Sequence, residues 1–120
     1  MSGRSHVLVV DDEPLIVDVL RDLFERQGLL VSTAANGLEA MRLLSTGSFD
    51  AVLTDLNMPG CGGAELVAAI RQRDAPLLPV IVLTADDWAA QDLATLGDIQ
   101  ILRKPAGITD ILAALGRALE

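Results

Sequence analysis

The chain has 120 residues, 51% of them hydrophobic, and a formal net charge of −8. This length and apolar content suit one folded domain and exclude a disordered chain. The acidic balance and the presence of only two Phe and one Trp argue against nucleic-acid binding, which relies on basic patches and aromatic stacking. A single cysteine excludes an internal disulfide, and the absence of a signal-peptide pattern or a long apolar run predicts a cytoplasmic location without membrane contact.

The chain begins with a strand and a helix. Residues 7–10 are a short apolar run, typical of a strand that is buried on both faces. Acidic residues and Pro14 follow, as expected where a helix starts. Apolar residues then recur at helical spacing from Leu15 to Phe24, and Gly28 stands where that helix should end.

The middle of the chain predicts two further strands, each followed by a helix. The strands cover residues 29–33 and 50–54. Asn36-Gly37 opens the second helix, which closes near Gly47, and residues 64–73 form the third. The residues expected to face inward on the second helix are Leu38, Met41 and Leu44.

The last third repeats this alternation. Strands are predicted over residues 80–84 and 99–102, a fourth helix from Asp86 or Asp87 to about residue 96, and a last helix from about Ile108. Five strands that alternate with five helices indicate right-handed crossovers and a parallel sheet covered on both faces. The sequence therefore predicts one doubly wound α/β domain.

Polar side chains follow four of the five predicted strands. In such sheets, ligands bind at the carboxyl ends of the strands. The residues found there are Asp11, Asp12, Asp55, Thr84 and Lys104. Each has a purely structural explanation, as a first-turn acid, a turn residue, a capping hydroxyl or a solvated lysine. Their gathering at one edge favours a functional site.

The residue types at this edge suit phosphoryl transfer. Three close carboxylates repel one another unless a cation lies among them, and an all-oxygen set suits Mg²⁺. A carboxylate such as Asp55 can form an aspartyl-phosphate. Lys104 would supply a positive charge and Thr84 a hydroxyl donor for the phosphoryl oxygens.

These residues lie in motifs that resemble the receiver domain of two-component response regulators. The motifs are Val-Val-Asp-Asp-Glu-Pro at 9–14, Leu-Thr-Asp-Leu-Asn-Met-Pro-Gly at 53–60, Leu-Thr-Ala at 83–85 and Arg-Lys-Pro at 103–105, and the match covers residues 6–119. The resemblance implies a flavodoxin-like (βα)5 fold with strand order 2-1-3-4-5, in which residues 1–5 are a tail and residues 6–120 the domain.

The resemblance also implies a role for each site residue. Asp55 would take a phosphoryl group from the phosphohistidine of a sensor histidine kinase or a histidine phosphotransfer protein. Asp11, Asp12, Asp55 and the backbone carbonyl of Asn57 would hold Mg²⁺. The phosphoryl group would be bound by Thr84, Lys104 and the backbone N–H of Ala85, and the peptide bond before Pro105 would be cis. The chain would be a signalling phospho-acceptor that assists its own phosphorylation and dephosphorylation, not an enzyme with a separate substrate; a homodimer is left open but not indicated.

Two departures from the family pattern concern the step after phosphorylation. Ile101 stands where receiver domains commonly carry a Tyr or Phe that rotates inward, and isoleucine has neither a hydroxyl nor a ring. The segment 84–97 is about two residues shorter than usual, which predicts a shortened fourth helix or a tightened loop before it. The sequence leaves open whether the chain is a phosphate relay, a phosphate sink or a domain of a larger protein.

Two other functions share some of these features with the phospho-acceptor. A small Mg²⁺-dependent phosphohydrolase would also form an aspartyl-phosphate, but it would carry an Asp-x-Asp motif after the first strand, where this chain has Asp11-Asp12-Glu13. A pseudo-receiver that binds partners without phosphorylation is disfavoured by the complete acidic set.

Overall fold

The fold is built around a parallel five-stranded sheet whose strands lie in the order β2-β1-β3-β4-β5. The computed structural model describes residues 4–56, 63–72, 78–85 and 99–120. The strands are β1 (His6–Val10), β2 (Leu30–Ala34), β3 (Ala51–Asp55), β4 (Val80–Thr84) and β5 (Ile99–Arg103). The helices in the described part are α1 (Pro14–Arg26), α2 (Gly37–Thr46), α3 (Gly63–Gln72) and α5 (Ile108–Ala118). This confirms the doubly wound fold and its strand order; the predicted fourth helix lies outside the described residues.

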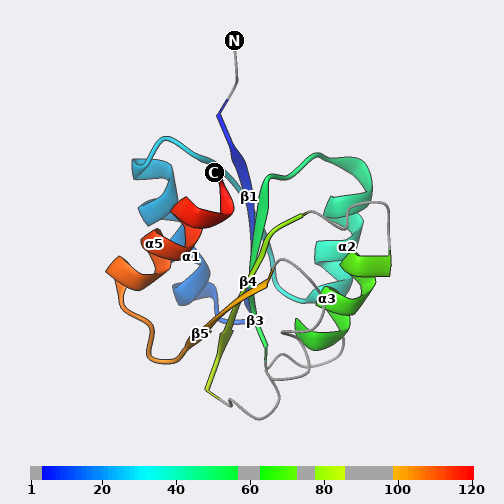
Figure 1. Cartoon of the computed structure of the whole chain (residues 1–120). Coiled ribbons are helices and arrows are strands. Elements are labelled where there is room, and N and C mark those ends of the chain that lie inside the picture. Colours follow the sequence, from blue (N-terminus) through cyan, green and yellow to red (C-terminus); the bar gives the residue numbers. More distant parts are fainter. Residues whose placement is uncertain (1–3, 57–62, 73–77, 86–98) are drawn as a thin grey trace.

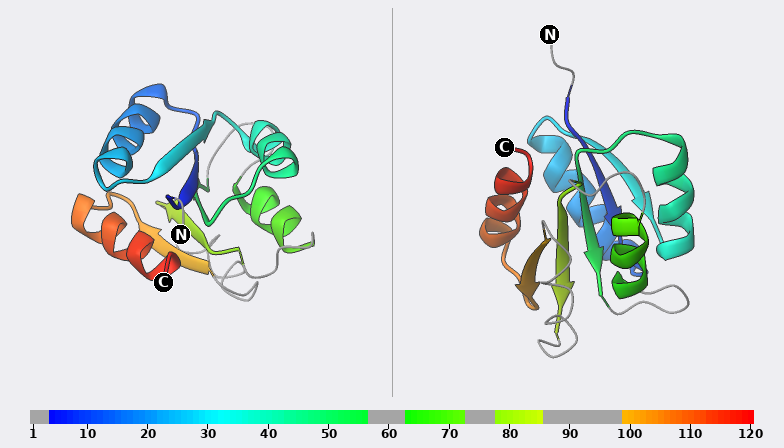
Figure 2. Two further views of the ribbon diagram at one scale, coloured as in Figure 1. Left: turned by 90° about the horizontal axis from the view of Figure 1, so that it is seen from above. Right: turned by 45° about the vertical axis from the view of Figure 1, so that its right-hand side comes forward.

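The helices form a layer on each face of the sheet. Helices α1 and α5 cover one face, and α2 and α3 cover the other (Figures 1 and 2). Strands β3 and β4 are buried along their whole length because both of their faces are covered. Each buried large apolar side chain contributes roughly 1.5 to 3 kcal/mol. This apolar core holds the strand ends, and with them the polar residues, in fixed positions.

Local signals in the sequence fix the helix ends. Pro14 is the first residue of α1, where its missing N–H is no loss. At the other end Gly28 has φ +86°, and the N–H groups of Gly28 and Leu29 donate to the carbonyls of Glu25 and Phe24. This is a Schellman motif, which needs a residue with positive φ. In α2 the Asn36 side chain accepts a hydrogen bond from an N–H of the first turn.

The prediction that Leu38 faces inward is wrong. Its side chain is 62% exposed, whereas Met41 and Leu44 pack against the core. Steps of three residues fall short of a full helical turn by about 60°, so two steps place Leu38 well away from Leu44 around the helix. The buried stripe of α2 is centred instead on Ala40.

Helix α1 also exposes apolar residues that follow the helical period, and it exposes more of them than α2 does. Only Leu20 and Phe24 of its apolar residues are buried, while Leu15, Ile16 and Val19 are exposed. The helical period correctly predicts a helix, but its apolar stripe is wider than the surface that the sheet can cover.

Among the described helices, none has both the length and the apolar character that spanning a bilayer requires.

Candidate functional site

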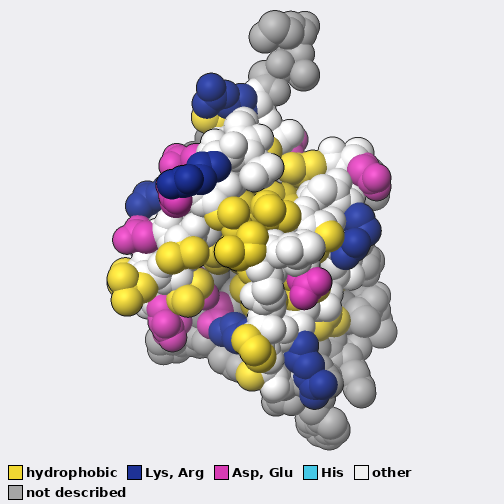
Figure 3. Space-filling model, turned by 90° about the vertical axis from the view of Figure 1, so that its left-hand side faces the viewer, with side chains coloured by type: hydrophobic (Ala, Val, Ile, Leu, Met, Phe, Trp, Pro, Cys, Tyr) yellow, Lys and Arg dark blue, Asp and Glu magenta, His cyan; other side chains and the backbone are white. Residues whose placement is uncertain are grey.

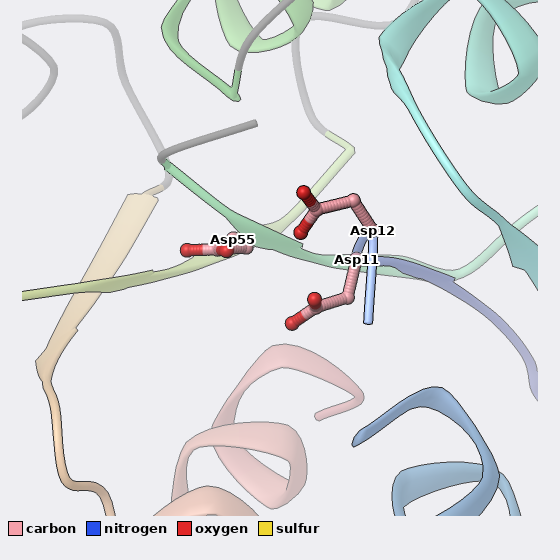
Figure 4. Close-up of side chains that lie close together, drawn as sticks. All are labelled: Asp11, Asp12 and Asp55. Carbon is pink, nitrogen blue, oxygen red and sulfur yellow. The ribbon is translucent and has the colours of Figure 1, made fainter. Parts of the chain in front are cut away.

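Sheet register places Asp11 and Asp55 side by side. Strands β1 and β3 are neighbours, and Val10 lies opposite Thr54. Asp11 follows β1 directly and Asp55 is the last residue of β3, so both carboxylates leave the same edge of the sheet. Asp11 is 3% exposed and Asp55 4%, whereas Asp12 is exposed. One oxygen from each of the three carboxylates lies within 4.8 Å of the others (Figure 4).

The electrostatics of this cluster favour a bound cation. Burial raises the pKa of Asp11, and the charges of Asp55 and Asp12 raise it further. The N–H of Glu13 donates a hydrogen bond to Asp11 Oδ1 at 2.9 Å. This hydrogen bond and the positive charge of Lys104 lower the pKa of Asp11 but do not cancel the rise. The net effect is a carboxylate that is costly to ionise without a further positive charge. Three oxygen ligands without a His or Cys in this cluster fit a hard divalent cation such as Mg²⁺.

Lys104 contacts Asp55 directly. Its Nζ lies 2.9 Å from Asp55 Oδ1, and its backbone N–H donates to the carbonyl of Thr84 at 2.8 Å. Burial disfavours the charged ammonium, but the hydrogen bond and charge of Asp55 outweigh this effect and raise the pKa of Lys104. The lysine is therefore held as a cation against the one carboxylate that ends a fully buried strand.

Thr84 and Ala85 complete the edge between β3 and β5. Thr84 is the last residue of β4 and is fully buried, and it lies opposite Arg103 of β5. Ala85 follows it and is exposed. The peptide bond between Lys104 and Pro105 is cis, as the resemblance implies. Asn57 lies outside the described residues, so its expected role stays a prediction.

The structure thus brings together Asp11, Asp12, Asp55 and Lys104, with Thr84 on the strand between Asp55 and Lys104. Sequence reasoning missed Glu13, whose N–H fixes the orientation of the Asp11 carboxylate. The available signal was the spacing, since an Asp often accepts a hydrogen bond from the N–H two residues ahead.

Known proteins resemble this chain in both sequence and fold. The family model described as "Response regulator receiver domain" matches residues 7–116. The chain belongs to this family. The DNA-binding transcriptional regulator NtrC of Escherichia coli (strain K12) is 38% identical over 118 residues, which are 97% of this chain and 25% of that protein. The positive alginate biosynthesis regulatory protein of Pseudomonas aeruginosa is 36% identical over 116 residues, 94% of this chain and 46% of that protein. This receiver domain spans a quarter to about half the length of these two relatives.

Solved structures show the same fold. A response regulator receiver protein from Pseudomonas putida superposes with a TM-score of 0.91 at 28% identity, covering 98% of this chain and 99% of that one. The response regulator TrrA from Thermotoga maritima, solved in complex with Mg²⁺-BeF, has a TM-score of 0.82 at 30% identity, covering 97% and 99% of the two chains.

Ile101 of this receiver domain is half-buried in β5. It lies opposite Val82 of β4 and packs against the core on the α2 and α3 side of the sheet. An aliphatic side chain in this place has no ring to rotate and no hydroxyl to exchange partners. Ile101 itself therefore cannot make the inward aromatic rotation that is common at this position of receiver domains.

Proposed function

We propose that this receiver domain accepts a phosphoryl group on Asp55 from a phosphohistidine of a sensor histidine kinase or a histidine phosphotransfer protein. The single observation that carries the proposal is that Asp55 lies between a lysine and two further carboxylates. Its buried carboxylate contacts Lys104 Nζ at 2.9 Å and shares a cluster with the carboxylates of Asp11 and Asp12. Such an arrangement supplies a nucleophile, a counter-charge and metal ligands.

In the transfer, an oxygen of the Asp55 carboxylate attacks phosphorus and the O–P bond forms as the P–N bond to the histidine breaks. The imidazole nitrogen leaves with the bonding electron pair and takes up a proton. Lys104 stabilises the negative charge on a phosphoryl oxygen, and the Thr84 hydroxyl and the Ala85 N–H donate to the others. The chain thereby assists its own phosphorylation, and the same groups would assist attack by water on the aspartyl-phosphate.

The residues that would hold Mg²⁺ are Asp11, Asp12, Asp55 and the backbone carbonyl of Asn57. The fit rests on the three oxygens within 4.8 Å and on the raised pKa of Asp11, which a cation would relieve. When bound, the ion neutralises charge on the phosphoryl oxygens during transfer.

The test is intact-mass measurement after incubation with Mg²⁺ and acetyl phosphate. We expect a single phosphoryl adduct, stable in acid and labile in base, that is absent in Asp55→Asn. Asp50→Asn is the matched control, because Asp50 is exposed just before β3, at the end of that strand away from the site. Rapid turnover of generic phosphate esters would instead support a phosphohydrolase, and the absence of any adduct would support a pseudo-receiver.

A further inference from the structure

Thr54 is a fully buried polar residue that directly precedes Asp55 in β3. Successive side chains of a strand point to opposite faces of the sheet. Leu53 packs under α1 and α5, so Asp55 points to the same side, whose outer surface carries acidic and basic side chains around an apolar area (Figure 3). Thr54 points to the side that α2 and α3 cover, together with Val52 and Leu56. It is thus a polar group within an apolar layer, on the opposite side of the sheet from the Asp55 carboxylate.

The strands on both sides of β3 place aliphatic residues next to Thr54. Sheet register sets it opposite Val10 of β1 and Val82 of β4, and both belong to the same apolar layer. A hydroxyl that is buried in such surroundings costs free energy unless it makes a hydrogen bond. Valine has nearly the same shape, is an equally good strand former and would be buried here without that cost. A threonine at this position therefore points to a use for its hydroxyl group.

The hydroxyl binds the peptide group that follows the acceptor. Thr54 Oγ1 donates a hydrogen bond to the carbonyl oxygen of Asp55 at 3.0 Å. The N–H of the same peptide group, which belongs to Leu56, donates to the carbonyl of Leu83 in β4 at 2.9 Å. Both polar atoms of one peptide plane are thus held at the point where β3 ends. This restricts the backbone ψ angle of Asp55, on which its allowed side-chain rotamers depend.

We propose that Thr54 is a positioning residue, whose hydroxyl orients Asp55 for phosphoryl uptake by holding the Asp55 carbonyl. The proposal rests on the proposed function, because it concerns the reaction at Asp55. The acceptor carboxylate has to meet Lys104 Nζ at 2.9 Å and, at the same time, the oxygens of Asp11 and Asp12 within 4.8 Å. Sites of this kind need their side chains held to within about 0.5 Å by groups that lie behind them.

The test separates the hydroxyl from the bulk of the side chain. Thr54→Val removes the hydroxyl and keeps the shape, whereas Thr54→Ser keeps the hydroxyl and removes a methyl group. Val52→Ala is the matched control, because it removes apolar bulk from the same face of the same strand and leaves the hydroxyl in place. Intact mass follows the rate of adduct formation with acetyl phosphate at saturating Mg²⁺. Calorimetry gives the Kd for Mg²⁺, and urea unfolding in EDTA gives the stability.

We expect Thr54→Val to slow phosphorylation by roughly tenfold and to raise the Kd for Mg²⁺ by a similar factor, as is usual when a hydrogen bond behind a site is removed. Thr54→Ser and Val52→Ala should match wild type in both measurements. All three variants should unfold at a lower urea concentration than wild type, Val52→Ala at the lowest. A role in stability alone would instead make the least stable variant the slowest.

Each alternative result overturns the proposal. A wild-type rate or a wild-type Kd in Thr54→Val would show that the hydroxyl does not orient Asp55. Equal slowing in Thr54→Ser, or slowing in Val52→Ala, would show that packing sets the position of the carboxylate. If Thr54→Val does not fold, Thr54→Cys replaces it in the comparison with Thr54→Ser, because a thiol is only a weak donor. Failure of the proposed function is distinct, since wild type would then form no adduct and the Kd values for Mg²⁺ alone would decide the role of Thr54.

Discussion

Asp11→Asn should stabilise the protein when Mg²⁺ is removed. Asp11 is 3% exposed, and its pKa is raised by burial and by the charges of Asp55 and Asp12. At neutral pH the folded state therefore bears an ionised group that it disfavours. An asparagine oxygen can still accept the 2.9 Å hydrogen bond from the N–H of Glu13, so the substitution removes the charge and little else.

The magnitude follows from the geometry. Two unit charges 4.8 Å apart, the largest separation of the ligand oxygens in the cluster, repel by roughly 3.5 kcal/mol at an effective dielectric constant of about 20. The ion pair of Lys104 with Asp55 offsets part of this repulsion. We expect Asp11→Asn to raise the free energy of unfolding by about 1 to 2 kcal/mol at pH 7, or roughly 3 to 8 °C in Tm.

The effect should depend on pH with a defined sign. Because the folded pKa of Asp11 lies above its ordinary value of 3.8, the protonated form contributes stability that is complete below that pH. This contribution is lost as the pH rises through the folded pKa. The advantage of Asp11→Asn over wild type should therefore be absent in acid and grow toward neutral pH.

Urea unfolding in EDTA, from acid to neutral pH, measures the difference in stability between Asp11→Asn and wild type. Added Mg²⁺ should reverse the sign of this difference. A ligand at one hundred times its Kd stabilises the folded state by about 2.7 kcal/mol. Mg²⁺ should therefore stabilise wild type more than it stabilises Asp11→Asn. Asp18→Asn, which removes a 63% exposed carboxylate from α1, should change stability by less than about 0.5 kcal/mol. If Asp11→Asn is no more stable than wild type in EDTA at neutral pH, or if its advantage persists in acid, the charge argument fails.

Three further outcomes follow from the structure. Lys104→Met should lower stability at neutral pH by about 1 kcal/mol or less, since the Lys104 side chain is 38% exposed and solvent screens its charge. The loss should fade as the pH rises above the raised pKa of the lysine, as urea unfolding at several pH values would show. Phe24→Ala removes a fully buried ring and should cost about 3 to 5 kcal/mol in the same assay. Gly28→Ala should cost on the order of 1 kcal/mol because φ is +86°, whereas Gly116→Ala in α5 should gain about 0.5 to 1 kcal/mol, as nothing lies within 4 Å of either new Cβ. Equal effects of these two alanines in thermal unfolding would contradict the backbone argument.

The sequence alone determined the secondary structure of the described residues, because its signals are local. Short apolar runs, Pro14, Asn36 and Gly28 gave the strands and helix ends to within one or two residues. The alternation of strands and helices was enough to predict a parallel sheet with its polar residues at one edge. The replacement of the usual aromatic residue by Ile101 was likewise visible without a structure.

Tertiary structure decided which residues meet and which faces stay uncovered. Chain order separates Asp11, Asp55 and Lys104 widely, and only the sheet order and register bring the acids within 4.8 Å and the lysine to 2.9 Å. Helical periodicity also gives the same pattern for a buried stripe and for an exposed one. Leu38 therefore reads as a core residue in the sequence and Val19 belongs to the apolar pattern of its helix, yet both are exposed, because the sheet covers only part of each helix. Residue types alone indicated the acceptor site, while the exposed apolar side chains of α1 and α2 are seen only in the packed fold.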